Sequence, residues 1–245
     1  MGSSDKTVII LAGGEAKRYM GLPKQMVDIC GEPLIHRMCR QVIERGYQPT
    51  IATDDDTIIR YFVDLKRIND TTVRFWSPAK GTTQYGWATT CPLWKNRVIM
   101  LWGDVIFSKH AMDMIFNSKG FCDFGATRQA EGFAFAYNEE DYERVLDAVK
   151  QTDYADWAFY RYLIGIPLET EGYDTEIFQD IKDYTTDIDY PLEYKYFLEN
   201  VVNAGIIDDL PPKPRLHYDK DFLDRIPTEG IVGRALLKSP KHLTI

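Results

Sequence analysis

Residues 7–24, TVIILAGGEAKRYMGLPK, decide the fold of the N-terminal part of this 245-residue chain. The β-branched apolar run at 7–11 is typical of a short buried strand, and it ends in two adjacent glycines. Glycine lets the backbone turn sharply and bring its N–H groups close to a bound group. Arg18 and Lys24 follow in the same loop, where a guanidinium and an ammonium can bind phosphate oxygens. The stretch therefore predicts a strand that leads into a phosphate-binding loop.

The two best-known glycine loops do not match this stretch. The Walker pattern needs a glycine, four further residues and then Gly-Lys-Ser/Thr. The dinucleotide pattern needs G-x-G-x-x-G. The residues instead resemble the opening signature of the GT-A-like nucleotidyltransferases, which include sugar-1-phosphate, cytidylyl and molybdenum-cofactor nucleotidyltransferases. That signature reads Leu-Ala-Gly/Ala-Gly-x-Gly-x-Arg, then Pro-Lys. The matching residues here are Leu11, Ala12, Gly13, Gly14, Arg18, Pro23 and Lys24, whereas Ala16 replaces the family's usual third glycine.

Two later motifs extend the resemblance. The apolar run 98–101 leads into Gly103 and Asp104, which places a carboxylate at the end of a buried strand. Ligands of open α/β sheets bind at the carboxyl ends of strands. The stretch 186–194, TDIDYPLEY, is similar to the family's Asp-Ile/Val-Asp-Thr-Pro-Glu-Asp, with Tyr190 in place of threonine. Taken singly, each aspartate is also typical of a helix cap.

The resemblance assigns roles to these residues. It implies that Asp104 and Asp189 hold a catalytic Mg²⁺, with Asp187 as a near neighbour. The NTP triphosphate would lie over residues 13–18, so Leu11, Ala12, Gly13 and Gly14 are expected nucleotide-binding residues. As catalytic residues, Lys24 would neutralise the α-phosphate and Arg18 would hold the leaving pyrophosphate.

A further nucleotide contact is expected before the helix predicted at 83–93. Relatives recognise the base near this point, and the candidate residues here are Lys80, Gly81, Thr82 and Thr83. Helix capping by Thr82 or Thr83 is the alternative interpretation. The aromatic-rich stretch 154–162 also has two interpretations. It is either a helix packed in the core or, by resemblance, a segment that covers the acceptor or forms a dimer arm.

Strand and helix patterns alternate along the first half of the chain. We expect strands at 7–12, 49–53, 72–76 and 97–102, and helices at 33–45, 55–66, 83–93 and 109–118, followed by paired strands at 122–128 and 132–137 and helices at 139–150 and 190–201. The fold class predicted is α/β, Rossmann-like of the GT-A type, with a mixed, mainly parallel sheet flanked by helices. We expect one nucleotidyltransferase domain over 1–205, with nucleotide-binding and acceptor-binding halves at about 1–105 and 106–205, and a tail at 206–245.

Other acidic and sulfur-bearing residues have structural interpretations. Three successive aspartates at 54–56 precede a helical pattern and are better explained as a cap than as a metal site. The four cysteines lack metal-binding spacing, so reduced thiols are expected.

Composition limits the partners. A net charge of -8 argues against nucleic acid, because phosphate backbones are met by basic surfaces. No apolar stretch has the length of a secretory or membrane-spanning segment, so we expect a cytoplasmic protein with no membrane partner. A homodimer is expected only by resemblance.

The resemblance implies a Mg²⁺-dependent nucleotidyltransferase. It would move an NMP group from an NTP to a small phosphorylated acceptor, such as a sugar phosphate or phospho-alcohol, and release pyrophosphate. The chain is close in length to compact cytidylyltransferases, which favours CTP. The alternatives are a GT-A glycosyltransferase that uses a nucleotide-sugar and a non-catalytic nucleotide-binding protein of the same fold.

Overall fold

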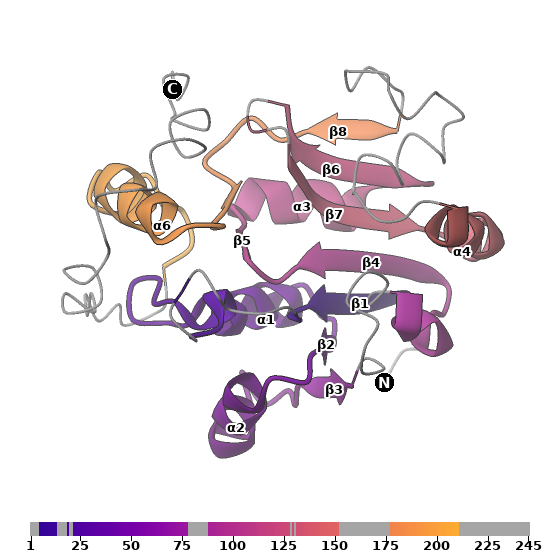
Figure 1. Cartoon of the computed structure of the whole chain (residues 1–245), viewed down its shortest axis with the longest axis horizontal. Helices are drawn as coiled ribbons and strands as arrows, with labels where there is room; N and C mark the ends of the chain where they lie inside the picture. Colours follow the sequence, from indigo (N-terminus) through magenta and orange to yellow (C-terminus); the bar gives the residue numbers. More distant parts are fainter. Residues whose placement is uncertain are drawn as a thin grey trace.

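The computed structural model describes residues 5–13, 19, 22–77, 88–127, 129, 131–151 and 177–210. Within these ranges, the main sheet contains β1 (Lys6–Leu11), β2 (Pro49–Ala52), β3 (Arg74–Trp76), β4 (Arg97–Trp102), β6 (Cys122–Ala126), β7 (Glu131–Tyr137) and β8 (Phe178–Asp180). Their order across the sheet is β3-β2-β1-β4-β7-β6-β8 (Figure 1). A separate pair joins β5 (Val105–Ile106) to β9 (Thr186–Asp187).

The sheet is parallel in its N-terminal half and mixed beyond it. β1 runs parallel to both β2 and β4, so Leu11 lies opposite Ala52 on one side and Trp102 on the other. β3 continues the parallel half. β7 is antiparallel to β4 and β6, while β8 is parallel to β6. The predicted α/β architecture with a mixed, mainly parallel sheet is confirmed.

Side chains that alternate along β1 build two cores. Val8 and Ile10 pack with α1 (Leu34–Glu44), α2 (Asp56–Leu65) and α3 (Lys109–Asn117) on one face. Ile9 packs on the other face with α4 (Tyr142–Gln151) and Trp94. This alternation is what a strand buried on both faces requires.

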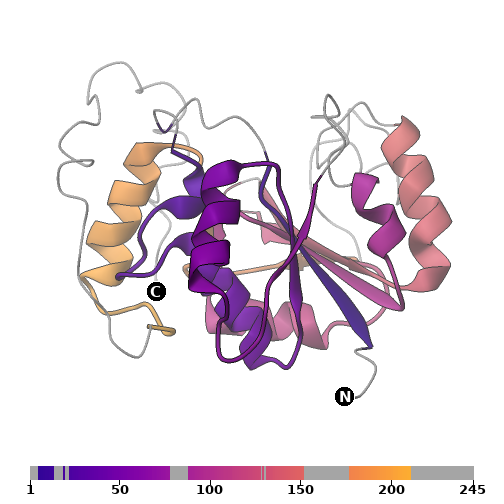
Figure 2. The same cartoon turned by 90° about the horizontal axis from the view of Figure 1, so that it is seen from below.

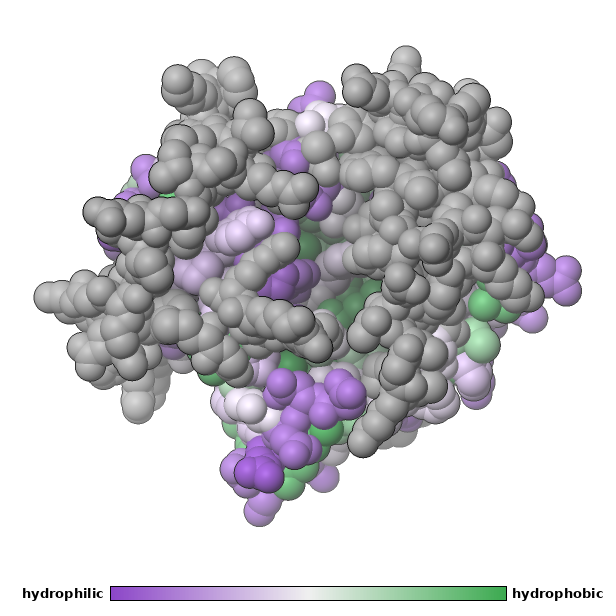
Figure 3. All heavy atoms as spheres, in the orientation of Figure 1, coloured by the Kyte–Doolittle hydropathy of each residue, from purple (hydrophilic) through white to green (hydrophobic). Residues whose placement is uncertain are grey.

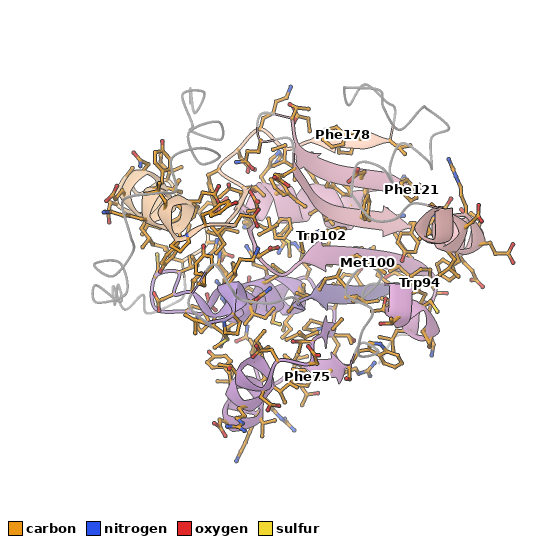
Figure 4. The ribbon with its side chains drawn as sticks, viewed as in Figure 1. Phe75, Trp94, Met100, Trp102, Phe121 and Phe178 are labelled. Atoms are coloured by element: carbon orange, nitrogen blue, oxygen red, sulfur yellow. The ribbon has the colours of Figure 1, made fainter. Side chains whose placement is uncertain are left out.

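Aromatic residues fill the second core along the length of β4. Figure 4 shows Trp94 near the start of this strand, Met100 further along and Trp102 close to its end. Trp94 makes an edge contact with Tyr137, and Trp102 makes one with Phe135, with ring centroids 5.2 and 5.1 Å apart. Such contacts stabilise aromatic pairs beyond the area that they bury.

The carboxyl ends of β1 and β4 point toward α6 (Pro191–Phe197). Figure 2 shows α6 and α4 at opposite ends of the molecule. A third core cluster fills the space around α6 and includes Tyr19, Leu34 and Ile188. The end of the sheet where α/β proteins bind ligands is thus bordered by α6.

Some predicted elements differ in extent. The helix expected at 83–93 is a 3-10 helix, Ala88–Leu93, and residues 83–87 lie outside the described residues. Pro92 lies inside it, and proline removes a backbone donor that an α-helix would use. The helix expected at 190–201 becomes α6 followed by a π-helical turn at Leu198–Val202. The short strands β5, β8 and β9 were not predicted.

The interpretation of the acidic run 54–56 as a cap is confirmed. The Asp55 side chain accepts hydrogen bonds from the backbone N–H groups of Thr57 and Ile58, at 2.8 and 3.2 Å. All four cysteines are free. Among the described residues, no helix combines the length and the apolar character needed to cross a bilayer.

Gly103 lets the chain cross closely over the end of β1. Its backbone N–H donates to the carbonyl oxygen of Leu11 at 2.8 Å. A Cβ atom at this position would lie 2.5 Å from that oxygen, which is closer than real Cβ contacts. The residue that follows is Asp104, so the glycine fixes where this carboxylate emerges from the sheet.

Gly103→Ala should lower the free energy of unfolding by about 2 kcal/mol, because the backbone of β1 cannot move away from the new methyl group without loss of packing. Urea denaturation measures this change. Gly46→Ala is the control, since its φ of +85° strains an alanine but no heavy atom crowds the position, and about 1 kcal/mol is expected. A loss below about 0.5 kcal/mol for Gly103→Ala would contradict the crowding argument.

Candidate active site

Backbone pairing brings Asp104 next to residues 187–189. Asp104 precedes β5, and Val105 of β5 pairs with Asp187 of β9. The N–H of Ile188 then donates to the carbonyl oxygen of Asp104 at 3.2 Å. Two segments far apart in the sequence are therefore held together by main-chain hydrogen bonds.

Lys24 lies between the two carboxylates that the sequence singled out. It begins a short 3-10 helix, Lys24–Met26, directly after Pro23. Its Nζ donates to Oδ2 of Asp104 and, at 2.9 Å, to Oδ1 of Asp189. The three side chains are only 21, 22 and 29% exposed, so these ion pairs are partly shielded from water. Shielding strengthens such contacts relative to surface pairs.

The electrostatic setting keeps Lys24 positively charged. Burial alone would lower the pKa of its ammonium group, but the neighbouring Asp104 and Asp189 outweigh burial and raise the pKa above its ordinary value. In this arrangement the Lys24 side chain therefore carries a positive charge at neutral pH.

A further carboxylate reaches the same place. Glu131 is the first residue of β7, and its carboxylate oxygen lies within 4.8 Å of ligand atoms of Asp187 and Asp189. Glu131 was not expected at this site, because it belongs to none of the three motifs and reaches the site through the pairing of β7 with β6.

The donor set suits a hard divalent cation. Glu131, Asp187 and Asp189 form an acidic cluster whose carboxylate oxygens lie within 4.8 Å of one another, and Asp104, which is not one of its members, shares Lys24 with Asp189. Carboxylates are the ligands that Mg²⁺ takes in proteins, usually one or two of them together with phosphate oxygens. These residues could therefore hold Mg²⁺.

The described part of the N-terminal loop lies beside Asp104. Leu11 is partly buried at the end of β1, whereas Ala12 is buried and its N–H donates to the carbonyl oxygen of Ala52 at 3.0 Å. Gly13 is exposed. The other expected residues, Gly14, Arg18, Lys80, Gly81, Thr82 and Thr83, lie outside the described residues, as does the stretch 154–162.

Figure 3 shows the described residues near the centre of one face, where hydrophilic and hydrophobic atoms both appear. A surface of this kind can bind a ligand that has both charged and apolar parts.

Comparison with solved structures identifies the fold. A nucleotidyl transferase from Methanothermobacter thermautotroptrophicus superposes with a TM-score of 0.59 at 11% identity, covering 82% of this chain and 100% of the other. The inositol-1-phosphate CTP transferase from T. maritima gives 0.55 at 13% identity, covering 84% and 99%. CMP:2-keto-3-deoxy-manno-octonic acid synthetase complexed with CTP gives 0.53 at 12% identity, covering 82% and 100%.

No protein-family model and no curated protein matches the chain. At these low identities the likeness to solved structures establishes a shared fold. The protein thus has the Rossmann-like fold of nucleotidyltransferases, as the N-terminal signature predicted.

Lys24→Met should strengthen the binding of Mn²⁺ in the absence of nucleotide by about 10-fold, which corresponds to roughly 1.4 kcal/mol. The ammonium group competes with a metal ion for the same oxygens of Asp104 and Asp189, so its substitution removes that competitor. Electron paramagnetic resonance of free Mn²⁺ measures the affinity. Lys119→Met is the control, because it removes the same charge from an exposed side chain. Weaker binding in Lys24→Met would show that the lysine does not compete with the ion.

Proposed function

We propose that this protein is a nucleotidyltransferase that moves a nucleoside monophosphate from an NTP to a small phosphorylated acceptor and releases pyrophosphate. The observation that carries the proposal is the meeting of Lys24, Asp104 and Asp189 at the carboxyl end of the parallel strands. The N-terminal loop signature and the shared fold with known nucleotidyltransferases support it.

The proposed reaction joins two anions, so charge neutralisation and alignment are the main needs. An oxygen of the acceptor phosphate forms a bond to the α-phosphorus in line with the leaving group. The bond from the α-phosphorus to the oxygen that bridges it to the β-phosphate breaks, and pyrophosphate leaves with that electron pair. No strong base is required, because a phosphate monoester is already ionised at neutral pH.

Each basic residue has a part in this proposal. Lys24 exchanges its carboxylate contacts for oxygens of the α-phosphate when the nucleotide binds. Arg18, which belongs to the N-terminal loop in the sequence, holds the pyrophosphate as a bidentate partner. Both residues carry permanent charge, so neither needs to gain or lose a proton during the reaction.

Mg²⁺ is the proposed cofactor, and Asp104 and Asp189 are its proposed ligands. Asp187 and Glu131 border the same position and add negative charge to it. When bound, Mg²⁺ supplies positive charge that offsets the charge of the two phosphate groups.

CTP is the proposed donor, and the acceptor is proposed to be a sugar phosphate, a phospho-alcohol or a similar compound. Two of the similar structures are named for a CTP transferase and a synthetase bound to CTP, which is consistent with this choice. Lys80, Gly81, Thr82 and Thr83 are the proposed base-recognising residues. The enzyme is proposed to act in the cytoplasm, as a homodimer.

Asp104→Asn should lower the rate of pyrophosphate release by about 100-fold or more, because it removes a charged ligand at the reacting phosphates but keeps the shape of the side chain. The assay supplies each of the four NTPs with Mg²⁺ and a pool of phosphorylated small molecules. NTP affinity, measured by calorimetry, should change far less than the rate.

Asp64→Asn is the matched control, since Asp64 is exposed near the C-terminal end of α2, where the chain has returned from the carboxyl ends of the parallel strands toward the start of β3. It should leave the rate unchanged. Equal losses of rate and NTP affinity in folded Asp104→Asn would argue against its catalytic role. Two outcomes would overturn the proposed reaction. One is pyrophosphate release in the absence of any acceptor, and the other is no pyrophosphate release with any of the four NTPs.

A further inference from the structure

Tyr19 connects the end of the N-terminal loop to the segment that carries the aspartates. Its side chain is fully buried in the core cluster around α6, where Val27 and Leu34 are among the other members. Its hydroxyl group donates a hydrogen bond to the carbonyl oxygen of Ile188 at 3.0 Å. In sequence, Tyr19 directly follows Arg18 and precedes Lys24 by five positions.

The hydrogen bond from Tyr19 is accepted by the peptide group that joins Ile188 to Asp189. The carbonyl of Ile188 and the N–H of Asp189 belong to one planar peptide group, so a contact that fixes this oxygen also fixes the plane. The N–H of Ile188, in the preceding peptide group, donates to the carbonyl oxygen of Asp104. Ile188 is therefore held on one side by Asp104 and on the other by Tyr19.

A buried hydroxyl group in this position destabilises the fold unless it forms a hydrogen bond. A hydroxyl group that is buried without a hydrogen-bond partner lowers the free energy of unfolding by about 1–3 kcal/mol. Burial raises the pKa of Tyr19, and the negative charges of Glu193, Asp189, Asp104 and Asp187 raise it further. The hydroxyl group thus stays protonated and remains a hydrogen-bond donor toward Ile188.

We infer that Tyr19 is a positioning residue that orients the carboxylate of Asp189 through the Ile188 peptide group. This inference rests on the proposed function, because it gives Asp189 the role of a metal ligand. Tyr19 itself touches neither the proposed substrates nor the ion. Partners of this kind typically contribute 10–100-fold to metal affinity or activity.

Tyr19→Phe isolates the hydroxyl group, since it keeps the buried ring. Tyr194→Phe is the matched control: Tyr194 lies in the same core cluster, is also buried, and donates its hydroxyl to the backbone carbonyl of Asp28. Each variant loses a hydrogen bond from a buried tyrosine hydroxyl group to a backbone carbonyl oxygen. Thermal denaturation should therefore report similar destabilisation for the two, so that stability alone does not separate them.

Metal affinity and the hydrogen exchange of nearby backbone amides distinguish the two variants. Mn²⁺ added without nucleotide should bind about 10-fold more weakly to Tyr19→Phe than to the natural protein, and less than about 2-fold more weakly to Tyr194→Phe. Hydrogen exchange of the backbone amides at 187–190 should become faster in Tyr19→Phe only. These readouts do not depend on turnover.

The outcomes distinguish this inference from the proposed reaction. Pyrophosphate release by the natural protein, together with unchanged Mn²⁺ affinity in Tyr19→Phe, would overturn the role of Tyr19 and leave the reaction intact. Silence in the pyrophosphate assay, with selective loss of Mn²⁺ affinity in Tyr19→Phe, would overturn the reaction and support the role of Tyr19. Equal weakening in both variants, or no Mn²⁺ binding by the natural protein, would overturn the inference.

Discussion

The pairing of β5 with β9 is the constraint on which the site depends. These strands have two residues each, yet with the Ile188–Asp104 hydrogen bond they hold two distant segments at the end of the sheet. This pairing brings Asp104, Asp187 and Asp189 to one location. The long strands β1 and β4 supply a rigid base, because their register fixes the position of Gly103 over Leu11.

The parts of the fold that the sequence predicted are those encoded locally. Continuous apolar runs mark β1 and β4, and the acidic run at 54–56 marks the start of α2. A helix was expected at 190–201, and α6 begins at Pro191 with Tyr190 as its N-cap. Proline is favoured in the first turn, where its missing N–H costs nothing.

The parts that could not be predicted arise from packing between distant segments. Two-residue strands such as β5 and β9 are too short for any periodic pattern. Glu131 joins the acidic cluster through the register of a hairpin, and Tyr19 has a role only once Ile188 lies against it. The motifs did predict that Lys24, Asp104 and Asp189 belong to one site. They did not indicate that the ammonium group would bridge the two carboxylates.

Among the residues that the structure describes, the excess of carboxylates around Lys24 also affects how a nucleotide would approach. A free NTP carries several negative charges, so the field of this acidic cluster repels it at distances up to the Debye length, about 8 Å at physiological ionic strength. Repulsion of like charges slows diffusional encounter and is weakened by salt. In the reaction proposed here, an NTP that arrives already complexed with a divalent ion meets a lower barrier, and added salt would speed association instead of slowing it.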